Sequence, residues 1–390
     1  MSLDFDNARM PNDNLTPNHH AWRDQLRRFF DKHVMPYAAD WDEAGDTPDD
    51  LILKAAEMGI IGLGYPEEYG GTSEGIDIWY KNILNEEFAR LGVGGVAASL
   101  MVHGIGLPPV IKFGHEEIKN HVAPAVISGK KRISLGITEP GAGSDVAQIA
   151  TTAIRDGDHY IVNGSKTFIT GGMKANWVTT AVRTGGAGKR GISTLLIPTD
   201  AEGFSRTALD KKQGWWASDT ATLYFDNVRV PAMNLIGEEN QGFSVIMHNF
   251  NSERMGMSVS MEASARVCLE EAVNWARARK TFGQRLADHQ VIRHKIADMK
   301  MRINATQAYI QVLSEQIEKG TENPGDIALL KVQCSQTMEY CAREAMQILG
   351  GSGYMRGNRV ERIYREVRVN AIGGGSEEIM RDLAARQYGL

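Results

Sequence analysis

The spacing of apolar residues divides the chain into helical ends and a β-rich middle. Thr16-Pro17 is typical of an N-cap followed by proline at the first helical position, and the apolar residues after it recur at helical spacing: Trp22, Leu26, Phe29, Phe30 and Val34. Further helices are predicted from Pro48-Asp49-Asp50 to Gly59, through Trp79 to Arg90, and from Val93 to Ile105. We therefore assign residues 1–130 to an N-terminal α-helical domain.

Near Lys131 the apolar period shortens to two and turn signals multiply. Asp156-Gly157 and Asn163-Gly164 are hairpin dipeptides that flank the apolar run 160–162. Strand-like runs follow at residues 177–182, 192–197 and 221–228. The pattern predicts a compact all-β domain over residues 131–240.

Long helical patterns return after the β-rich segment, at residues 241–279, 290–319 and 324–349. We assign residues 241–390 to a C-terminal helical domain. The order of helices, then strands, then helices lacks βαβ alternation, so a doubly wound parallel sheet is not expected.

Composition narrows the function classes. The chain has 390 residues, and 43 basic against 48 acidic residues give a net charge of −5 without a basic block, so nucleic-acid binding is not expected. We find no run of 18 uninterrupted apolar residues and predict no membrane insertion. The three cysteines have neither disulfide nor metal spacing, and the acidic start of the chain does not resemble a leader, so we expect a cytoplasmic protein.

Familiar catalytic motifs are incomplete. Gly141-Ala142-Gly143 lacks the third glycine and the following helix of a dinucleotide-binding turn. The histidines do not have the spacing of a zinc-binding helix, and Gly351-Ser352-Gly353 lacks the outer pattern of a nucleophile elbow. Metal and serine hydrolases therefore have no support.

Two strand ends have the composition of a cofactor site. Residues 136–145 combine small residues with short hydroxyls, which suits a pyrophosphate or a planar heterocycle, although an ordinary β-turn would have the same composition. In residues 163–172, Phe168 and Thr170 are two apart, so on a regular strand they share a face where Phe168 can stack on a ring that Thr170 hydrogen-bonds. A plain hairpin strand is the alternative.

These two segments resemble the flavin-binding strands of the acyl-CoA dehydrogenase family. Three more segments match that family in order: residues 279–284 with His289-Gln290, residues 347–354, and residues 374–379. The resemblance covers essentially the whole chain. It implies a multi-domain α+β fold with an all-α N-terminal domain, a central β-barrel-like domain and a C-terminal four-helix bundle.

The resemblance also implies a reaction, the FAD-dependent oxidation of an acyl-CoA thioester to the trans-2-enoyl-CoA, as in fatty acid β-oxidation. A carboxylate removes the α-proton in this reaction, and many members carry it as a glutamate in the closing loop, where this chain has Gly374. The long-chain and isovaleryl-CoA branches carry the base on a long helix instead, and Glu253 matches that position. Glu377 and Glu378 are the rival bases, and a helix–helix ion pair is the structural alternative for Glu253.

The resemblance also implies a set of site residues, each taken from the matching position of the family. One FAD is expected to contact Leu135, Ile137, Thr138, Gly143, Ser144, Phe168, Thr170, Ser376 and Glu378. A partner subunit's FAD is expected to contact Arg279, Thr281, Phe282, Leu286, His289, Gln290, Gln347, Gly350 and Gly351. The acyl-CoA is expected to contact Ser144, Asn251, Arg254 and Gly374, whose backbone N–H would donate to the thioester carbonyl.

A site shared between chains requires an oligomer, and the resemblance implies a homotetramer that passes electrons to an electron-transferring flavoprotein. Two alternatives stay open. One is a flavin-dependent oxidase or monooxygenase on the same fold, and the other is a non-catalytic flavoprotein that acts as a binding partner.

Overall fold

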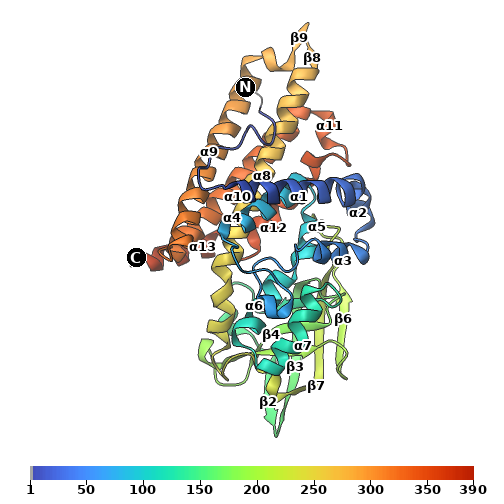
Figure 1. Cartoon of the computed structure of the whole chain (residues 1–390), viewed down its shortest axis with the longest axis vertical. Coiled ribbons are helices and arrows are strands. Elements are labelled where there is room, and N and C mark those ends of the chain that lie inside the picture. The colour runs from blue at the N-terminus through green and yellow to red at the C-terminus, as the bar shows by residue number, and fades with distance from the viewer. Residues whose placement is uncertain (1–2) are drawn as a thin grey trace.

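The computed structural model describes residues 3–390 and confirms the predicted fold class, with helices at both ends and a curled sheet between them (Figure 1). The N-terminal helices are α1 (Pro17–His33), α2 (Ala38–Ala44), α3 (Asp50–Glu57), α4 (Ile78–Arg90), α5 (Gly94–Met101), α6 (His103–Phe113) and α7 (Glu116–Ile127). Side-chain caps fix the starts of some of these helices. Thr16 caps α1 in a capping box with His19, and Asp77 caps α4.

The prediction of a single helix from Val93 to Ile105 is wrong. The helix is interrupted at Val102, and the second helix, α6, continues to Phe113. Pro108 and Pro109 lie inside α6, where proline removes a backbone donor. The stretch Gly94–Phe113 is also the one described segment long and apolar enough to cross a membrane, with a mean hydropathy of 1.4. Buried core helices pass the same test, and residues such as Val96 and Leu107 are buried in the core here, so it is weak evidence for a membrane span.

The middle of the chain forms a sheet in the order β1-β4-β2-β3-β7-β6, with β5 paired to β4. Its strands are β1 (Ile133–Gly136), β2 (Thr152–Asp156), β3 (His159–Thr170), β4 (Trp177–Arg183), β5 (Ile192–Pro198), β6 (Phe204–Ala208) and β7 (Thr220–Pro231). The hairpin at Asp156-Gly157 is confirmed between β2 and β3. The turn predicted at Asn163-Gly164 is wrong, because these residues lie inside β3, where a bulge shifts its register with β7.

The three long C-terminal helices begin and end close to the predicted positions, and three shorter helices that were not predicted individually follow them. They are α8 (Gly242–Ala278), α9 (Gln290–Glu318), α10 (Pro324–Leu349), α11 (Gly351–Tyr354), α12 (Arg359–Ile372) and α13 (Glu377–Gln387), and a short hairpin of β8 (Lys280–Thr281) and β9 (Gln284–Arg285) follows α8. One apolar core, with Val259, Ile303 and Met338 among its members, joins α8, α9 and α10. Helix α8 runs from the sheet to the far tip of the molecule, where the β8–β9 hairpin lies (Figure 1).

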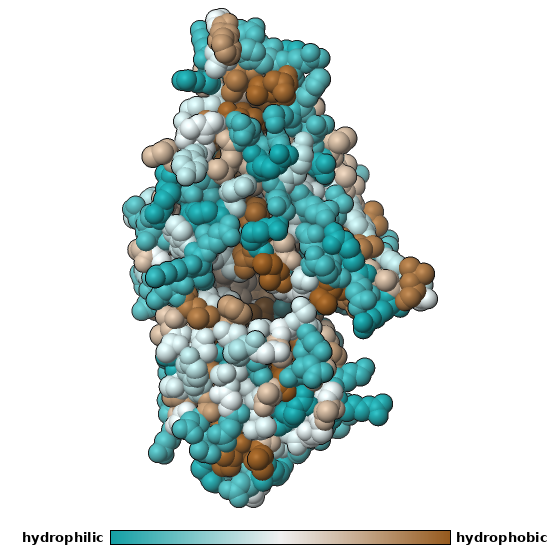
Figure 2. All heavy atoms as spheres, turned by 180° about the vertical axis from the view of Figure 1, so that it is seen from behind, coloured by the Kyte–Doolittle hydropathy of each residue, from teal (hydrophilic) through white to brown (hydrophobic). Residues whose placement is uncertain are grey.

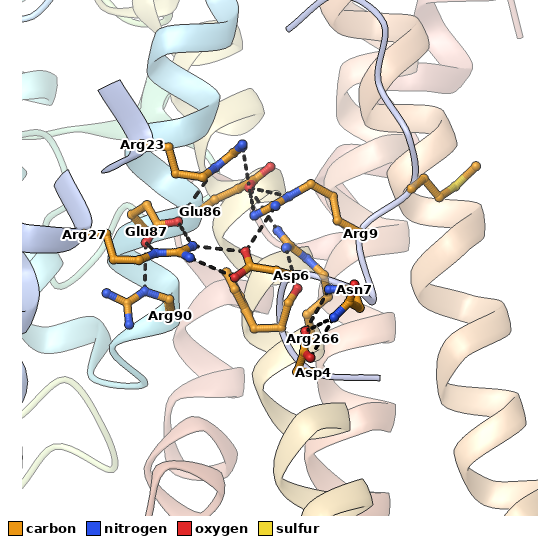
Figure 3. Close-up of polar contacts among 12 residues, drawn as sticks. Asp4, Asp6, Asn7, Arg9, Arg23, Arg27, Glu86, Glu87, Arg90 and Arg266 are labelled. Carbon is orange, nitrogen blue, oxygen red and sulfur yellow. Dashed lines mark hydrogen bonds and ion pairs between the residues drawn. The ribbon is translucent and has the colours of Figure 1, made fainter. Parts of the chain in front are cut away.

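The chain before α1 crosses the helices as an N-terminal strap, residues 3–15. Phe5 is buried, and its carbonyl accepts from Arg266 of α8 at 3.2 Å. Asp6 pairs with Arg27 of α1 at 2.8 Å, and Arg9 pairs with Glu86 of α4 at 2.8 Å (Figure 3). The ion pairs join the strap to the N-terminal helices, and the Arg266 hydrogen bond joins it to α8 in the C-terminal part.

Candidate active site

The first candidate segment is the end of β1 and the loop after it, and a buried ion pair holds its shape. The carboxylate of Glu139 accepts from the Nζ of Lys166 at 2.7 Å and from the backbone N–H groups of Ala150 and Thr151 at 2.6 and 2.9 Å. Lys166, which is fully buried, also donates to the Ile137 carbonyl at 3.1 Å. Both ends of the loop are therefore fixed to β3 and to the chain ahead of β2.

The tip of this loop is open. Gly143 and Ser144 are exposed, and a Cβ added to Gly143 would meet no other atom within 4 Å. No internal packing therefore requires the missing side chain, and the backbone there is accessible to a ligand.

The second segment lies beside the first, because the Thr167 N–H donates to the Thr138 carbonyl at 2.8 Å. Phe168 has φ 58° and is 69% exposed, next to a register shift between β3 and β7. The prediction that Phe168 and Thr170 share a face by strand alternation is therefore wrong, since the bulge interrupts the alternation. A large aromatic residue held exposed in a left-handed conformation is strained, and such strain is common where a ligand binds.

The start of α8 packs against the first segment. Leu135 and Ile137 share an apolar cluster with Phe243, Met247 and Phe250 of α8. Because Glu253 lies less than one helical turn beyond Phe250, this packing brings the predicted base close to the end of β1.

Glu253 is partly buried, and its carboxylate is held by one amide. The Nδ2 of Asn249 donates to Glu253 Oε1 at 2.7 Å. Burial raises the pKa of Glu253 to about 7, against the Asn249 hydrogen bond and the Arg254 charge, which both lower it. Glu253 forms no ion pair with any residue between 3 and 390. The alternative that Glu253 belongs to a helix–helix ion pair is therefore wrong.

Tyr65 is close enough to this carboxylate for the Glu253 charge to act on its phenol. Burial, and then the Glu253 charge, raise the pKa of the Tyr65 phenol above its usual range. The Tyr65 ring is 5.9 Å from the ring of His103, and burial lowers the pKa of His103 to about 4. Burial therefore keeps both rings neutral near pH 7.

Two cations hold the glycine loop that closes the site. Arg254 Nε donates to the Gly374 carbonyl at 3.1 Å, and Lys331 Nζ of α10 donates to the Gly375 carbonyl. Burial, and then the Arg254 charge, lower the pKa of Lys331 to about 8. Arg254 is itself buried and also donates to Asn251 Oδ1 at 3.4 Å, so these two hydrogen-bond partners lie in the glycine loop and on α8.

Gly374 has φ +68°, and a Cβ added there would lie 2.9 Å from the sulfur of Met257. Met257 is one turn beyond Glu253 on α8, so the predicted base and the side chain that approaches Gly374 share one face of the helix. The loop position is thus closed to a larger residue while the helix position carries the carboxylate.

The rival bases are less suited to accept a proton. Glu377 accepts from Ser335 at 2.6 Å and from Gln336 and Arg381 at 3.1 Å; burial alone would raise its pKa, but these bonds lower it. Glu378 is exposed, and hydrogen bonds from its own backbone and from Ser376, the N-cap of α13, lower its pKa.

The residues expected to reach a second FAD lie far from Glu253. Arg279, Phe282, Gln290, Gln347, Gly350 and Gly351 are exposed, whereas Thr281, Leu286 and His289 are partly buried. Arg279 follows the last residue of α8, about 39 Å of helix beyond Glu253 at 1.5 Å per residue. The structure therefore places the first candidate set near Glu253. The second set lies away from it, toward the opposite end of α8.

The β8–β9 hairpin orders this second set. Thr281 Oγ1 lies 2.9 Å from His289 Nε2, and the turn residues Phe282 and Gly283 have φ 50° and 80°. Phe282 is 97% exposed, so two aromatic residues of the candidate sets, Phe168 and Phe282, are exposed in left-handed conformations. Neither conformation follows from the sequence pattern.

The surface is hollowed where the helical part meets the sheet, and hydrophobic residues lie at the margin of this hollow (Figure 2). A separate cavity of about 640 Å³ lies at the other end of α8, bounded by residues that include Leu3, Val273 and Met301. None of the candidate site residues bounds that cavity, so it does not mark the predicted chemistry.

The sequence pattern did not indicate the polar residues that support the site: Asn249, Lys331 and the Lys166–Glu139 pair. Asn249 precedes Glu253 by four residues, which on a helix places both on one face. This spacing was the available signal. The contacts of Lys331 and Lys166 depend on distant segments and had no local signal.

Known proteins match the whole chain. Family models match residues 16–130, 134–228 and 240–389, and they describe the N-terminal, middle and C-terminal domains of acyl-CoA dehydrogenases. The long-chain specific mitochondrial acyl-CoA dehydrogenase of Sus scrofa is 34% identical over 96% of this chain and 87% of its own. A probable acyl-CoA dehydrogenase from Mycobacterium abscessus is 43% identical, with a TM-score of 0.93 over 96% of this chain and 99% of its own. A glutaryl-CoA dehydrogenase from Mycobacterium smegmatis in complex with FADH2 is 26% identical, with a TM-score of 0.90 over 96% of this chain and 95% of its own.

Proposed function

Because the chain belongs to the acyl-CoA dehydrogenase family, we propose that it oxidises an acyl-CoA to the trans-2-enoyl-CoA with Glu253 as the base. The chain is an oxidoreductase that acts on acyl-CoA. The observation that carries the finer proposal is the Glu253 carboxylate, which is partly buried, held by an amide rather than by a cation, and has a pKa of about 7.

Glu253 takes the proton from the carbon next to the thioester carbonyl. A base with a pKa near the working pH is ionised often enough to act and basic enough to remove a weakly acidic proton. Burial supplies both properties, because it removes water from the carboxylate and raises its pKa.

The negative charge that develops on the thioester oxygen needs a donor. The Gly374 N–H is the donor that we propose, supported by the way Arg254 and Lys331 hold the two carbonyls of this glycine loop. We propose that Asn251 and Ser144 contact the substrate at the edge of the same site.

We propose FAD as the cofactor, which when bound supplies the hydride acceptor for the β-carbon. The open backbone at Gly143 and the exposed ring of Phe168 fit a large planar group with a phosphate chain. Leu135, Ile137, Thr138 and Thr170 would hold it on the sheet side, with Ser376 and Glu378 on the side of α13.

We propose that each site is shared between two chains of a homotetramer, because about 39 Å of helix separates Glu253 from Arg279. Electrons would then pass to an electron-transferring flavoprotein in the cytoplasm. The acyl chain length is open in this proposal.

The test is reduction of the purified flavoprotein by a panel of straight and branched acyl-CoA thioesters without oxygen. We expect a yellow protein whose flavin absorbance is bleached by at least one thioester and restored by an electron-transferring flavoprotein. A colourless protein that cannot be reconstituted with FAD would contradict the proposal. Rapid reoxidation by oxygen while product is bound would favour an oxidase instead.

A further inference from the structure

The side chain that touches the predicted base belongs to Asn249, and the same amide also reaches a second helix. Its Nδ2 donates to Glu253 Oε1 at 2.7 Å and to the carbonyl of Gly104 in α6 at 3.2 Å. The Gly104 carbonyl can only accept, so this atom must be the amide nitrogen, and each of its two hydrogens has its own partner.

Gly104 is free to accept because of the sequence of α6. In an α-helix the carbonyl of residue 104 accepts from the N–H of residue 108, but residue 108 is a proline and has none. Asn249 replaces the missing donor. The proline therefore creates an acceptor at a defined point of α6, opposite α8.

The carboxylate itself has few other constraints. Arg254 and Tyr65 are the other titratable groups that act on Glu253, and Arg254 directs its hydrogen bonds to Gly374 and Asn251. Among the described residues, Asn249 is the one whose side chain forms a hydrogen bond to the Glu253 carboxylate.

We propose that Asn249 is a positioning residue that orients the Glu253 carboxylate by anchoring it to the free Gly104 carbonyl of α6. This inference rests on Glu253 being the base. An amide fixed at one hydrogen presents the other in one direction, so the carboxylate is oriented before the substrate arrives. The same donor favours the ionised carboxylate, so its loss also raises the pKa of Glu253.

The experiment compares Asn249→Ala with Ser252→Ala in the FAD-loaded enzyme. Ser252 is exposed on the same helix next to Glu253, and it serves as the matched control. For Asn249→Ala we expect kcat at pH 7 to fall about 10- to 100-fold, because small misplacements of a reacting group have effects of this size. KM should stay within about twofold, since ground-state binding is not changed. Ser252→Ala should match the wild type.

Two further readouts separate positioning from a structural role. The acidic limb of the kcat profile should move to higher pH in Asn249→Ala, so part of the loss should be recovered at alkaline pH. In a Glu253→Gln background, Asn249→Ala should change neither acyl-CoA affinity nor residual turnover, because the group through which it acts is gone.

Each of these results either supports or overturns the positioning role of Asn249. An unmoved acidic limb, or an equal loss of turnover in the Glu253→Gln background, would overturn the positioning role and leave Asn249 as a helix contact. Wild-type turnover by Glu253→Gln alone would instead contradict the proposed base. The two failures are therefore distinguishable.

Discussion

Glu253 holds its proton more tightly in the folded chain than in the unfolded one, and this has a consequence for stability. Its pKa is raised from 4.5 to about 7, so the folded state keeps a proton that the unfolded chain releases between these two values. The associated stability is present below pH 4.5, falls as the pH rises to about 7, and stays lower above it. The ionised Glu253 carboxylate therefore destabilises the fold above pH 7, where the proposed reaction would need it.

Glu253→Gln should lower turnover by a factor of about 10²–10⁴ and, above pH 7, raise the free energy of unfolding by up to about 3 kcal/mol. Glutamine keeps the size of the side chain but has no proton to lose. Urea unfolding at pH 5 and pH 8.5, with flavin bleaching on the same samples, tests both effects. A variant less stable than the wild type at pH 8.5 would show that Glu253 has a structural partner.

Gly374 is constrained by its neighbour as well as by its backbone. Gly374→Ala should lower the free energy of unfolding by about 1–3 kcal/mol, because the new Cβ meets the Met257 sulfur at 2.9 Å and φ is positive. In a Met257→Ala background the same substitution should cost less, since only the backbone strain remains. Equal costs in the two backgrounds would mean that Met257 does not restrict the loop.

At the scale of elements, α8 has two separate tasks at its two ends. Its first half packs on the proposed flavin-binding segments and carries Glu253, whereas its last turn leads to the exposed β8–β9 hairpin. Arg279, between α8 and β8, is exposed in the single chain. A charged residue at this place is available to a partner rather than to the core.

Arg279→Ala should weaken FAD retention about tenfold, because a charge-assisted hydrogen bond to a partner's cofactor would be lost. Arg277→Ala, an exposed arginine in the last turn of α8, is the matched control and should retain FAD normally. FAD release during dilution at high salt measures the difference. Identical retention by both variants would contradict a shared site.

The sequence predicted the elements best where a long apolar period has clear ends. The helices predicted at 241–279, 290–319 and 324–349 differ from α8, α9 and α10 by at most one residue at each end. The break at Val102 and the bulge at Asn163-Gly164 were missed, because packing of distant segments overrides the local signal there. The role of Pro108 was missed for a related reason, since its effect depends on a residue of α8 that is far away in the sequence.

At the scale of the whole molecule, the N-terminal strap joins parts that are distant along the chain. Glu86 of α4 lies 2.8 Å from Arg9 of the strap and 3.3 Å from both Arg23 of α1 and Arg266 of α8 (Figure 3). Burial alone would raise the pKa of Glu86, but the three arginines lower it to about 2. The family model begins at residue 16, so the strap lies outside the matched region.

Glu86→Gln should lower the free energy of unfolding at pH 7 by about 3 kcal/mol, because three arginines would lose their shared partner. A carboxylate with a lowered pKa contributes stability above its ordinary value of 4.5, and this contribution is lost as the pH falls toward 2. The difference between variant and wild type should therefore shrink in acid. Urea unfolding at pH 7 and pH 3 measures it, and a difference that persists unchanged at pH 3 would show that the carboxylate charge is not responsible.

The length of α8 also has a genetic consequence. If each site combines Glu253 of one chain with Arg279 of its neighbour, a Glu253→Gln chain and an Arg279→Ala chain can complement each other. A hybrid pair contains one site with both defects and one site with none, so two defective alleles expressed together should give an active enzyme. The Glu253→Gln allele alone would lack the base, the Arg279→Ala allele alone would be limited by its loss of FAD, and a chain carrying both substitutions would not be rescued by either single variant.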